Sequence, residues 1–186
     1  EPGVNLLTNG VFETPAVTHE AGWNIFENGT TGLGWMVDWV SNFTGAPDNG
    51  WLELHAGVNG WLPSEGEQYA ELDSDWQGPG GPSGEEASVE ISQTIETIPG
   101  ETYTLSWDFS PRPNTTDADN ELDVFVRGRN GGDPVATNGG AGGSANTWLS
   151  DSFSFVADSD ETTVTFADDG TPNSSGTFLD NVMLSC

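Results

Sequence analysis

Short stretches of alternating apolar and polar residues, separated by turns rich in Gly and Pro, restrict the fold of this chain more than any other feature. The 25 Gly and 11 Pro are spread at short intervals, and no segment keeps a 3.6-residue period over three turns. The clearest stretch is Thr102–Phe109, whose apolar face carries Tyr103, Leu105, Trp107 and Phe109. Such alternation is typical of a strand with one core face and one polar face. The chain is therefore predicted to be all-β.

Nine or ten short strands follow from the same pattern. The predicted strands are Val4–Leu7, Gly34–Val40, Trp51–His55, Tyr69–Asp73, Ser88–Ile95, Thr102–Phe109, Glu121–Arg127, Trp148–Val156, Thr162–Phe166 and Gly176–Leu184. Gln77–Glu86 and Arg129–Ala145 are predicted to be flexible loops, and Ile98–Glu101 to be a type II turn with Pro and Gly at its centre. Many short strands joined by turns favour a two-sheet antiparallel β-sandwich. We expect residues 1–186 to form one domain.

The charge of the chain excludes several classes of partner. Three Arg, no Lys and 30 Asp and Glu give a formal net charge of -27. A nucleic acid or an anionic membrane surface would be repelled in the absence of a basic patch. No run of 18 apolar residues is present, so direct membrane insertion is not expected. Many carboxylates suit a salty or calcium-rich medium, where cations screen them or bind to them.

The ends of the chain suggest an excised product. It begins at Glu1 without Met and shows no signal peptide, which indicates a mature product or a domain cut from a larger secreted protein. The one cysteine is the last residue, Cys186, so no internal disulfide can form.

The segment Trp51–Asp73 carries the first candidate ligand site. Its two predicted strands direct their Leu and Ala residues to the core, and the opposite face carries Trp51, Glu53, His55, Tyr69, Glu71 and Asp73. Exposed aromatic rings beside acids are not needed for solubility, and they indicate a surface for a polar, ring-shaped ligand. In so acidic a chain, a merely solvated face is the alternative.

The order of several motifs resembles that of a known family. NLLTNGVFETP followed by Gly22-Trp23, then ISQTIETIPGETYTLSWDF, and finally TFLDNVMLS together resemble extracellular carbohydrate-binding modules with the galactose-binding-like jelly-roll fold. The segment from LELHAGVNGWLPSEGEQYAELD to FSPRPNT is similar to a bacterial subgroup found in large secreted proteins and adhesins. The resemblance implies a jelly roll, an extracellular or cell-surface location and a glycan or polysaccharide partner. The subgroup has an Arg at the position of Arg112.

Calcium is the cofactor that the resemblance implies. In the family, a structural calcium lies where the first and last strands meet, and the matching positions are Asn9, Glu13 and Asp180. A hard cation takes 6–8 oxygen ligands, so side chains of this type are suitable. A turn residue and a solvated strand end are the alternative reading of the same positions. A possible second calcium site is the acidic run with Asp117, Asp119, Asn120 and Asp123, which lacks the Gly and Glu of an EF-hand.

The function favoured by these observations is non-catalytic, calcium-dependent carbohydrate binding by a lectin- or adhesin-type module, with a monomer favoured. The candidate ligand-binding residues are Trp51, Glu53, His55, Glu65, Tyr69, Glu71, Asp73 and Arg112. A structural spacer or protein-binding domain of a secreted multidomain protein is the main alternative. A small polysaccharide hydrolase or lyase is the lesser one, because Glu53 and Glu71 could form a glycosidase pair and His55 could add a base.

Overall fold

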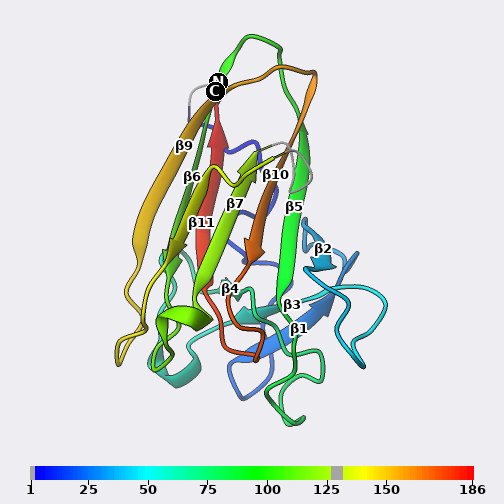
Figure 1. The fold of residues 1–186 in the computed structure, drawn as a ribbon, viewed down its shortest axis with the longest axis vertical. Coiled ribbons are helices and arrows are strands. Elements are labelled where there is room, and N and C mark those ends of the chain that lie inside the picture. Colours follow the sequence, from blue (N-terminus) through cyan, green and yellow to red (C-terminus); the bar gives the residue numbers. More distant parts are fainter. Residues whose placement is uncertain (1–2, 127–131) are drawn as a thin grey trace.

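Two antiparallel sheets pack face to face in the computed structural model, which describes residues 3–126 and 132–186 (Figure 1). The six-stranded sheet has the order β1-β3-β4-β11-β6-β9, and the five-stranded sheet has the order β2-β5-β10-β7-β8. The prediction of an all-β, two-sheet sandwich is confirmed. None of the helices in the described ranges is long and apolar enough to cross a membrane.

The strands are short to medium in length, as the spacing of the turns requires. The first sheet contains β1 (Trp23–Glu27), β3 (Trp51–His55), β4 (Tyr69–Glu71), β11 (Phe178–Ser185), β6 (Thr102–Ser110) and β9 (Leu149–Val156). The second contains β2 (Met36–Trp39), β5 (Val89–Glu96), β10 (Glu161–Asp168), β7 (Glu121–Val126) and β8 (Ala136–Gly139). Two short 3-10 turns are η1 (Val58–Gly60) and η2 (Asp117–Asp119).

The core forms where the apolar faces of the two sheets meet. On β6 the four alternating residues Tyr103, Leu105, Trp107 and Phe109 are all buried, as the pattern predicts. The ring of Trp107 contacts that of Phe166 on β10 edge to face, with centroids 5.7 Å apart, so aromatic packing joins the two sheets. The turn before β6 also follows the prediction, since Gly100 has a φ of 91° and Glu101 N donates to Ile98 O.

Three sequence-based expectations differ from the observed strands. Val4–Leu7 is not a strand. Leu6 N donates to Leu184 O, but the other contacts with β11 come from the Asn5 side chain, which accepts from Leu184 N and donates to Val182 O. The predicted long loop Arg129–Ala145 contains β8, and its first residues lie outside the described ranges. Trp23–Glu27 forms an unexpected strand, β1, which pairs with β3.

The outer face of β7 is also different from the prediction. The alternation of Glu121–Arg127 predicts that Leu122, Val124 and Val126 face the core and that Asp123, Phe125 and Arg127 face solvent, but Asp123 and Phe125 are only 8% and 4% exposed. Asp123 accepts a hydrogen bond from Thr137 of β8. Arg127, the last residue of the predicted strand, lies outside the described residues.

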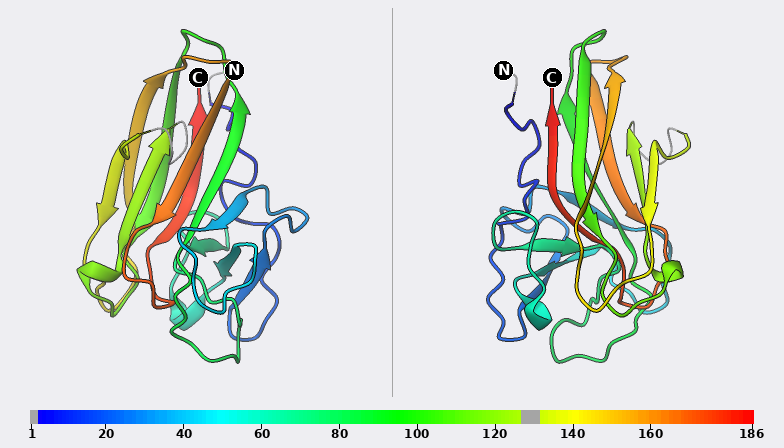
Figure 2. Two further views of the ribbon diagram at one scale, coloured as in Figure 1. Left: turned by 45° about the vertical axis from the view of Figure 1, so that its right-hand side comes forward. Right: turned by 90° about the vertical axis from the view of Figure 1, so that its left-hand side faces the viewer.

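The two ends of the sandwich have different structures. The first described residues and the C-terminus lie at one end, near the connection that crosses from β9 in one sheet to β10 in the other, and the views of Figure 2 agree on this. At the opposite end, β1, β3 and β4 cross below the long strands together with the loops that precede β5, follow β6 and precede β11. These loops cover the short strands and form the candidate site.

Candidate ligand-binding site

The outer face of β3 and β4 is buried, which corrects the expectation of a solvent-facing ligand surface. Glu53 and His55 are 4% and 1% exposed, and Tyr69, Glu71 and Asp73 are fully buried. A second apolar cluster covers this face, made of Trp61, Tyr69 and Phe178 with Val58 and Trp148 packed against it. Alternation predicted the two faces of the strands correctly, but the loops cover the polar one.

A buried histidine lies between two carboxylates on this face. Residues Glu53 and Glu71 are directly opposite each other in the β3–β4 pair, a position where two like charges are destabilising. The Nε2 atom of His55 lies 2.5 Å from Glu53 Oε1 and 3.0 Å from Glu71 Oε2. The imidazole therefore compensates the repulsion between the two acids.

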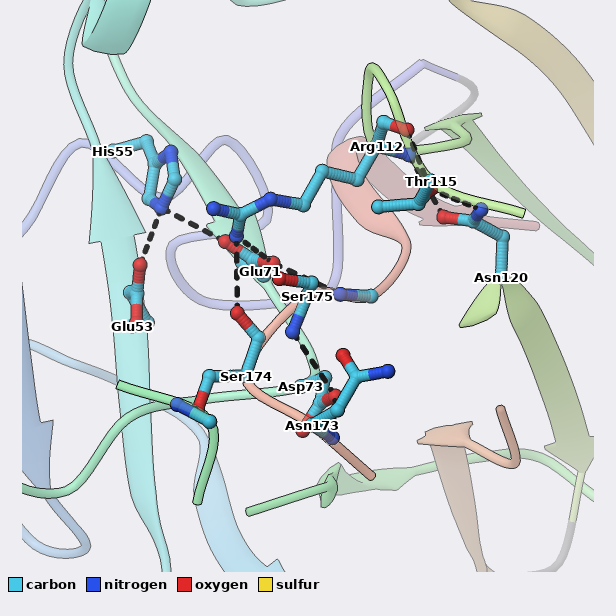
Figure 3. A network of polar contacts seen from close by, with 12 residues as sticks. Glu53, His55, Glu71, Asp73, Arg112, Thr115, Asn120, Asn173, Ser174 and Ser175 are labelled. Carbon is cyan, nitrogen blue, oxygen red and sulfur yellow. Dashed lines mark hydrogen bonds and ion pairs between the residues drawn. The ribbon is translucent and has the colours of Figure 1, made fainter. Parts of the chain in front are cut away.

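Arg112 provides the second positive charge. Its Nη1 donates to Glu71 Oε1 and to Ser174 O, the latter at 3.3 Å (Figure 3). The guanidinium also lies 5.8 Å from the ring centroid of Trp61. The Arg112 side chain is 21% exposed, whereas the Glu71 side chain is fully buried. Arg112 thus connects the buried acid to the surface of the molecule.

The loop that carries Arg112 is held by Asn120. The Oδ1 of Asn120 accepts from Arg112 N at 2.8 Å, and its Nδ2 donates to Thr115 Oγ1 and Thr116 O. Gly142 runs beside this loop so closely that an added Cβ would lie 1.7 Å from the Arg112 carbonyl oxygen. These contacts hold the guanidinium over Glu71.

The charges of this network follow from burial and from its contacts. Burial acts to raise the pKa of Glu71, but the charges of Arg112 and His55 outweigh it and hold that pKa below its ordinary value. Burial acts to lower the pKa of His55, but hydrogen bonds to Glu53 and Glu71 raise it to about 9. Burial and the charge of Glu71 raise the pKa of Glu53 to about 7. At neutral pH the site therefore contains an imidazolium, a guanidinium, one carboxylate and one group near its midpoint.

A cavity of about 280 Å³ opens onto this network. Its lining residues are Trp23, Glu53, His55, Val58, Asp75, Ser83, Gly84, Arg112, Asn173, Ser174 and Ser175. The size is near the lower end of the roughly 300–1,000 Å³ that small-molecule pockets span. The wall combines the apolar surfaces of Trp23 and Val58 with many hydrogen-bonding groups, so it suits a small polar ligand with one apolar face.

The far wall of the cavity joins two loops. Ser174 Oγ accepts from Gly84 N at 3.0 Å and donates to Glu85 O at 3.2 Å. Beside it, burial and the adjacent carboxyl of Glu85 raise the pKa of Asp75 to about 6. The loops before β5 and β11 therefore form one continuous wall.

A sequence model described as "Protein of unknown function (DUF642)" matches residues 76–185, more than half of the chain. The chain belongs to the DUF642 family. The matched segment includes Arg112, Ser174 and the loop before β5, whereas Trp23, Glu53 and His55 precede it. A search of the curated proteins found no match.

Solved structures similar to this DUF642 chain include carbohydrate-binding modules. A family 16 module is 17% identical with a TM-score of 0.51, and the match covers 98% of this chain and 100% of that one. A family 61 module in complex with β-1,4-galactotriose is 16% identical, with 97% of each chain covered and a TM-score of 0.44. A family 35 module from Clostridium thermocellum is 12% identical, with 87% and 90% covered and a TM-score of 0.40. The first of these establishes that the DUF642 chain has the sandwich fold of such modules.

The predicted ligand residues are only partly brought together. Glu53, His55, Glu71 and Arg112 form one network, and Tyr69 packs against His55 with ring centroids 5.2 Å apart. Trp51 and Glu65 do not line the cavity. Asp73 does not line the cavity either, but its Oδ2 accepts from Asn173 N and Ser175 N, which belong to lining residues.

Several lining residues were missed by sequence reasoning. The missed positions are Trp23, Val58, Asp75, Ser83, Gly84 and Asn173–Ser175. The motif Gly22-Trp23 was noted only as part of the family resemblance, although an aromatic ring beside a Gly turn was an available signal. The loop residues carry no comparable signal, since Ser, Asn and Gly are ordinary in loops.

The residues expected to hold a structural calcium hold loops through hydrogen bonds. Asn9 Oδ1 accepts from Thr14 N, Glu13 Oε1 accepts from Glu67 N and Gln68 N, and Asp180 Oδ2 accepts from Ser64 N and Glu65 N. Burial raises the pKa of Asp180 to about 7. None of their side-chain oxygens is buried without a partner. Calcium at this position stays a prediction, without an unsatisfied oxygen to support it.

Two of the side chains predicted to form a second calcium site, Asp119 and Asn120, already form hydrogen bonds within the protein. Asp119 forms a capping box with Thr116, which lowers the pKa of Asp119, and the Asn120 side chain holds the Arg112 loop. Asp117 is exposed, and Asp123 lies in a different group, close to Glu121 and Asp169. Within the described ranges, two groups of three acidic or His side chains bring their ligand atoms close together. One is Glu121, Asp123 and Asp169, and the other is Glu53, His55 and Glu71.

Proposed function

We propose that this chain is a non-catalytic carbohydrate-binding module that holds a sugar unit in the cavity above Glu53, His55 and Arg112. The observation that carries the proposal is the combination of a fixed hydrogen-bonding network with an apolar ring, Trp23, in one small cavity. The sandwich shared with a family 16 carbohydrate-binding module supports it.

The chemistry of the cavity matches a sugar ring. Carboxylates such as Glu53 and Asp75 can accept from hydroxyl groups, while the Arg112 guanidinium and the Ser175 hydroxyl can donate to them. The apolar C–H face of a sugar can pack on Trp23 or Val58. Because the network is already held by internal bonds, little side-chain freedom is lost on binding. Affinity for one short ligand would be modest, and repeated domains in a larger protein would increase it through avidity.

The same geometry favours binding over catalysis. The carboxyl oxygens of Glu53 and Glu71 that contact His55 lie within 4.8 Å of each other, close to the spacing of about 5–5.5 Å in retaining glycosidases. Glu71, however, is fully buried beneath Arg112 and does not line the cavity. This burial separates Glu71 from a ligand in the cavity, which supports a binding role for the site over the use of the two residues as acid and nucleophile.

The proposal includes an extracellular or cell-surface setting, a glycan or polysaccharide partner, a monomer and dependence on calcium. The strong negative charge supports the extracellular setting and the dependence on calcium, since cations that screen or bind carboxylates are abundant outside cells. A spacer or protein-binding domain remains the alternative, and it predicts no response to saccharides.

A glycan array, run with calcium and again with EDTA, tests the proposal. A variant that fills the cavity, Ser83→Trp, should lower the affinity for a positive glycan at least tenfold, because Ser83 is an exposed residue of the cavity wall. The matched control is Ser159→Trp, which adds the same ring to an exposed position at the other end of the sandwich. A silent array with folded protein, or equal binding by both variants, would exclude this function at this site.

A further inference from the structure

Two buried carboxylates outside the His55 network come together where the two sheets meet. Asp73 follows β4 of the first sheet and Asp168 ends β10 of the second, and both are fully buried. Ser88 links them, because it forms an isolated bridge with Asp73 and its Oγ donates to Asp168 Oδ2 at 2.6 Å. Figure 3 shows Asp73 between Ser175 and Asn173, whose backbone N–H groups donate to its Oδ2.

One oxygen of each carboxylate has no hydrogen-bond partner. Asp73 Oδ1 and Asp168 Oδ1 are buried and unpaired, while the other oxygen of each residue is well bonded. The hydroxyl of Thr177 is also buried without a partner, and this residue follows Gly176 and accepts from Leu72 N through its carbonyl oxygen. Buried polar atoms are nearly always satisfied, so an unpaired pair of carboxylate oxygens indicates a missing group.

No basic side chain supplies that group in the described ranges. There, the basic residues that pair with carboxylates are His55 and Arg112, and both pair with Glu53 or Glu71. Burial raises the pKa of Asp73 to about 7, and burial together with the charge of Asp73 raises that of Asp168 well above its ordinary value. Two buried anions without a counterion would be costly.

Gly176 packs tightly against both acids. A Cβ added at this residue would lie 2.6 Å from Asp73 Cβ and 3.0 Å from Asp168 Oδ1. The φ of Gly176 is not in the positive range, so the backbone conformation does not require glycine there. The absence of a side chain instead lets the loop before β11 lie directly against Asp73 and the unpaired oxygen of Asp168.

We propose that Asp73 and Asp168 bind a divalent cation, calcium first, through their Oδ1 atoms. Calcium prefers carboxylate, hydroxyl and carbonyl oxygens, and it accepts six to eight of them in flexible geometry. Thr177 Oγ1 is a third candidate ligand, and backbone carbonyls or water complete the shell. This position differs from Asn9, Glu13 and Asp180, where hydrogen bonds already engage the side chains.

A cation here would also order the sugar cavity. Asp73 Oδ2 holds the backbone of Asn173 and Ser175, and Ser174 O accepts from Arg112. A cation that fixes Asp73 would therefore fix this loop, which lines the cavity. This consequence rests on the proposed function, whereas cation binding itself does not.

The test is a titration of EDTA-treated protein with terbium and with calcium at pH 7, in the absence of any sugar. The eight Trp residues sensitise terbium luminescence, and titration calorimetry with calcium gives the number of calcium ions bound per chain. We expect one tight site, and a melting temperature that rises by roughly 5–10 °C when calcium is at 100 times its Kd. Asp168→Asn should remove both effects. Glu121→Gln, at an exposed residue of the group formed with Asp123 and Asp169, should retain them.

Three outcomes overturn the proposal. The first is the absence of a tight cation site in the native chain, and the second is a site that Asp168→Asn leaves intact. The third is a melting temperature that does not change with calcium, which is expected if the two acids share a proton and bind no cation. Because Asn removes a buried charge, Asp168→Asn should be at least as stable as the native chain in EDTA, so loss of binding will not reflect unfolding. If the chain binds the cation but no glycan on the array, the cation site is supported and the proposed sugar-binding function of the cavity is rejected.

Discussion

Replacing Glu71 by Gln removes the one group that contacts both positive charges of the buried network. Glu71 Oε1 accepts from Arg112 Nη1 and from Gly176 N, and Oε2 lies 3.0 Å from His55 Nε2. The glutamine amide can keep the acceptor, but its NH₂ would face the donor of the protonated imidazole. The variant therefore leaves two buried cations with only Glu53 as a counterion.

The magnitude follows from the burial of the pair. Removing one partner of a buried ion pair costs about 3–5 kcal/mol. For a chain of 186 residues, each kcal/mol corresponds to roughly 2–4 °C in melting temperature, so we expect a decrease of about 6–20 °C. Urea denaturation at pH 7 in EDTA measures the free energy of unfolding directly.

A matched control isolates the effect of burial. Glu101→Gln makes the same chemical change at an exposed turn, and it should stay within about 0.5 kcal/mol of the native chain. The NMR titration of His55 gives a second readout, since its pKa of about 9 should fall when Glu71 loses its charge. A loss below about 1 kcal/mol with an unchanged His55 titration would refute the ion network as described.

Three further predictions follow from the same contacts. Because the pKa of His55 is raised from 6.5 to about 9, its stabilisation is complete below pH 6.5 and is lost as the pH rises through 9. Urea titrations should show a loss on the order of 3 kcal/mol over this range, at about 1.36 kcal/mol per pH unit, and His55→Gln should flatten it. Asn120→Ala should cost about 1–3 kcal/mol by the same assay and weaken glycan binding, because the Arg112 loop loses its acceptor; unchanged binding would show that Arg112 needs no such support. Gly176→Ala should cost about 1–3 kcal/mol, because its Cβ meets Asp73, whereas Gly143→Ala has room and should be nearly neutral. Equal stability of the two alanine variants would contradict the tight packing at Gly176.

The fold was predictable because strand alternation is local information. The residues of β2, and those of β6 as far as Trp107, alternate between buried and more exposed positions as their period-2 pattern requires. The expected turn at Gly100 is also present, since its positive φ is a property of the residue type. Strand β1 was missed because WNIFE is half-buried along most of its length and lacks a clear alternation.

The candidate site was predictable only in part. Glu53, His55 and Glu71 are near each other because two strands of one hairpin-like segment pair in register. Arg112 was proposed from the family resemblance, and the structure places it on Glu71. Asp168 carried no signal, since a single Asp at the end of a strand is ordinary in so acidic a chain.

The sequence by itself determined the class of fold, the separation of each strand into two faces and the strong negative charge, because these depend on neighbouring residues and on composition. Tertiary structure decided which polar faces are buried. Loops distant in sequence cover β3 and β4, convert a predicted surface into a buried ion network and bring Asp73 to Asp168. Burial depends on what packs against a strand from elsewhere in the chain, and the pattern within the strand does not contain that information.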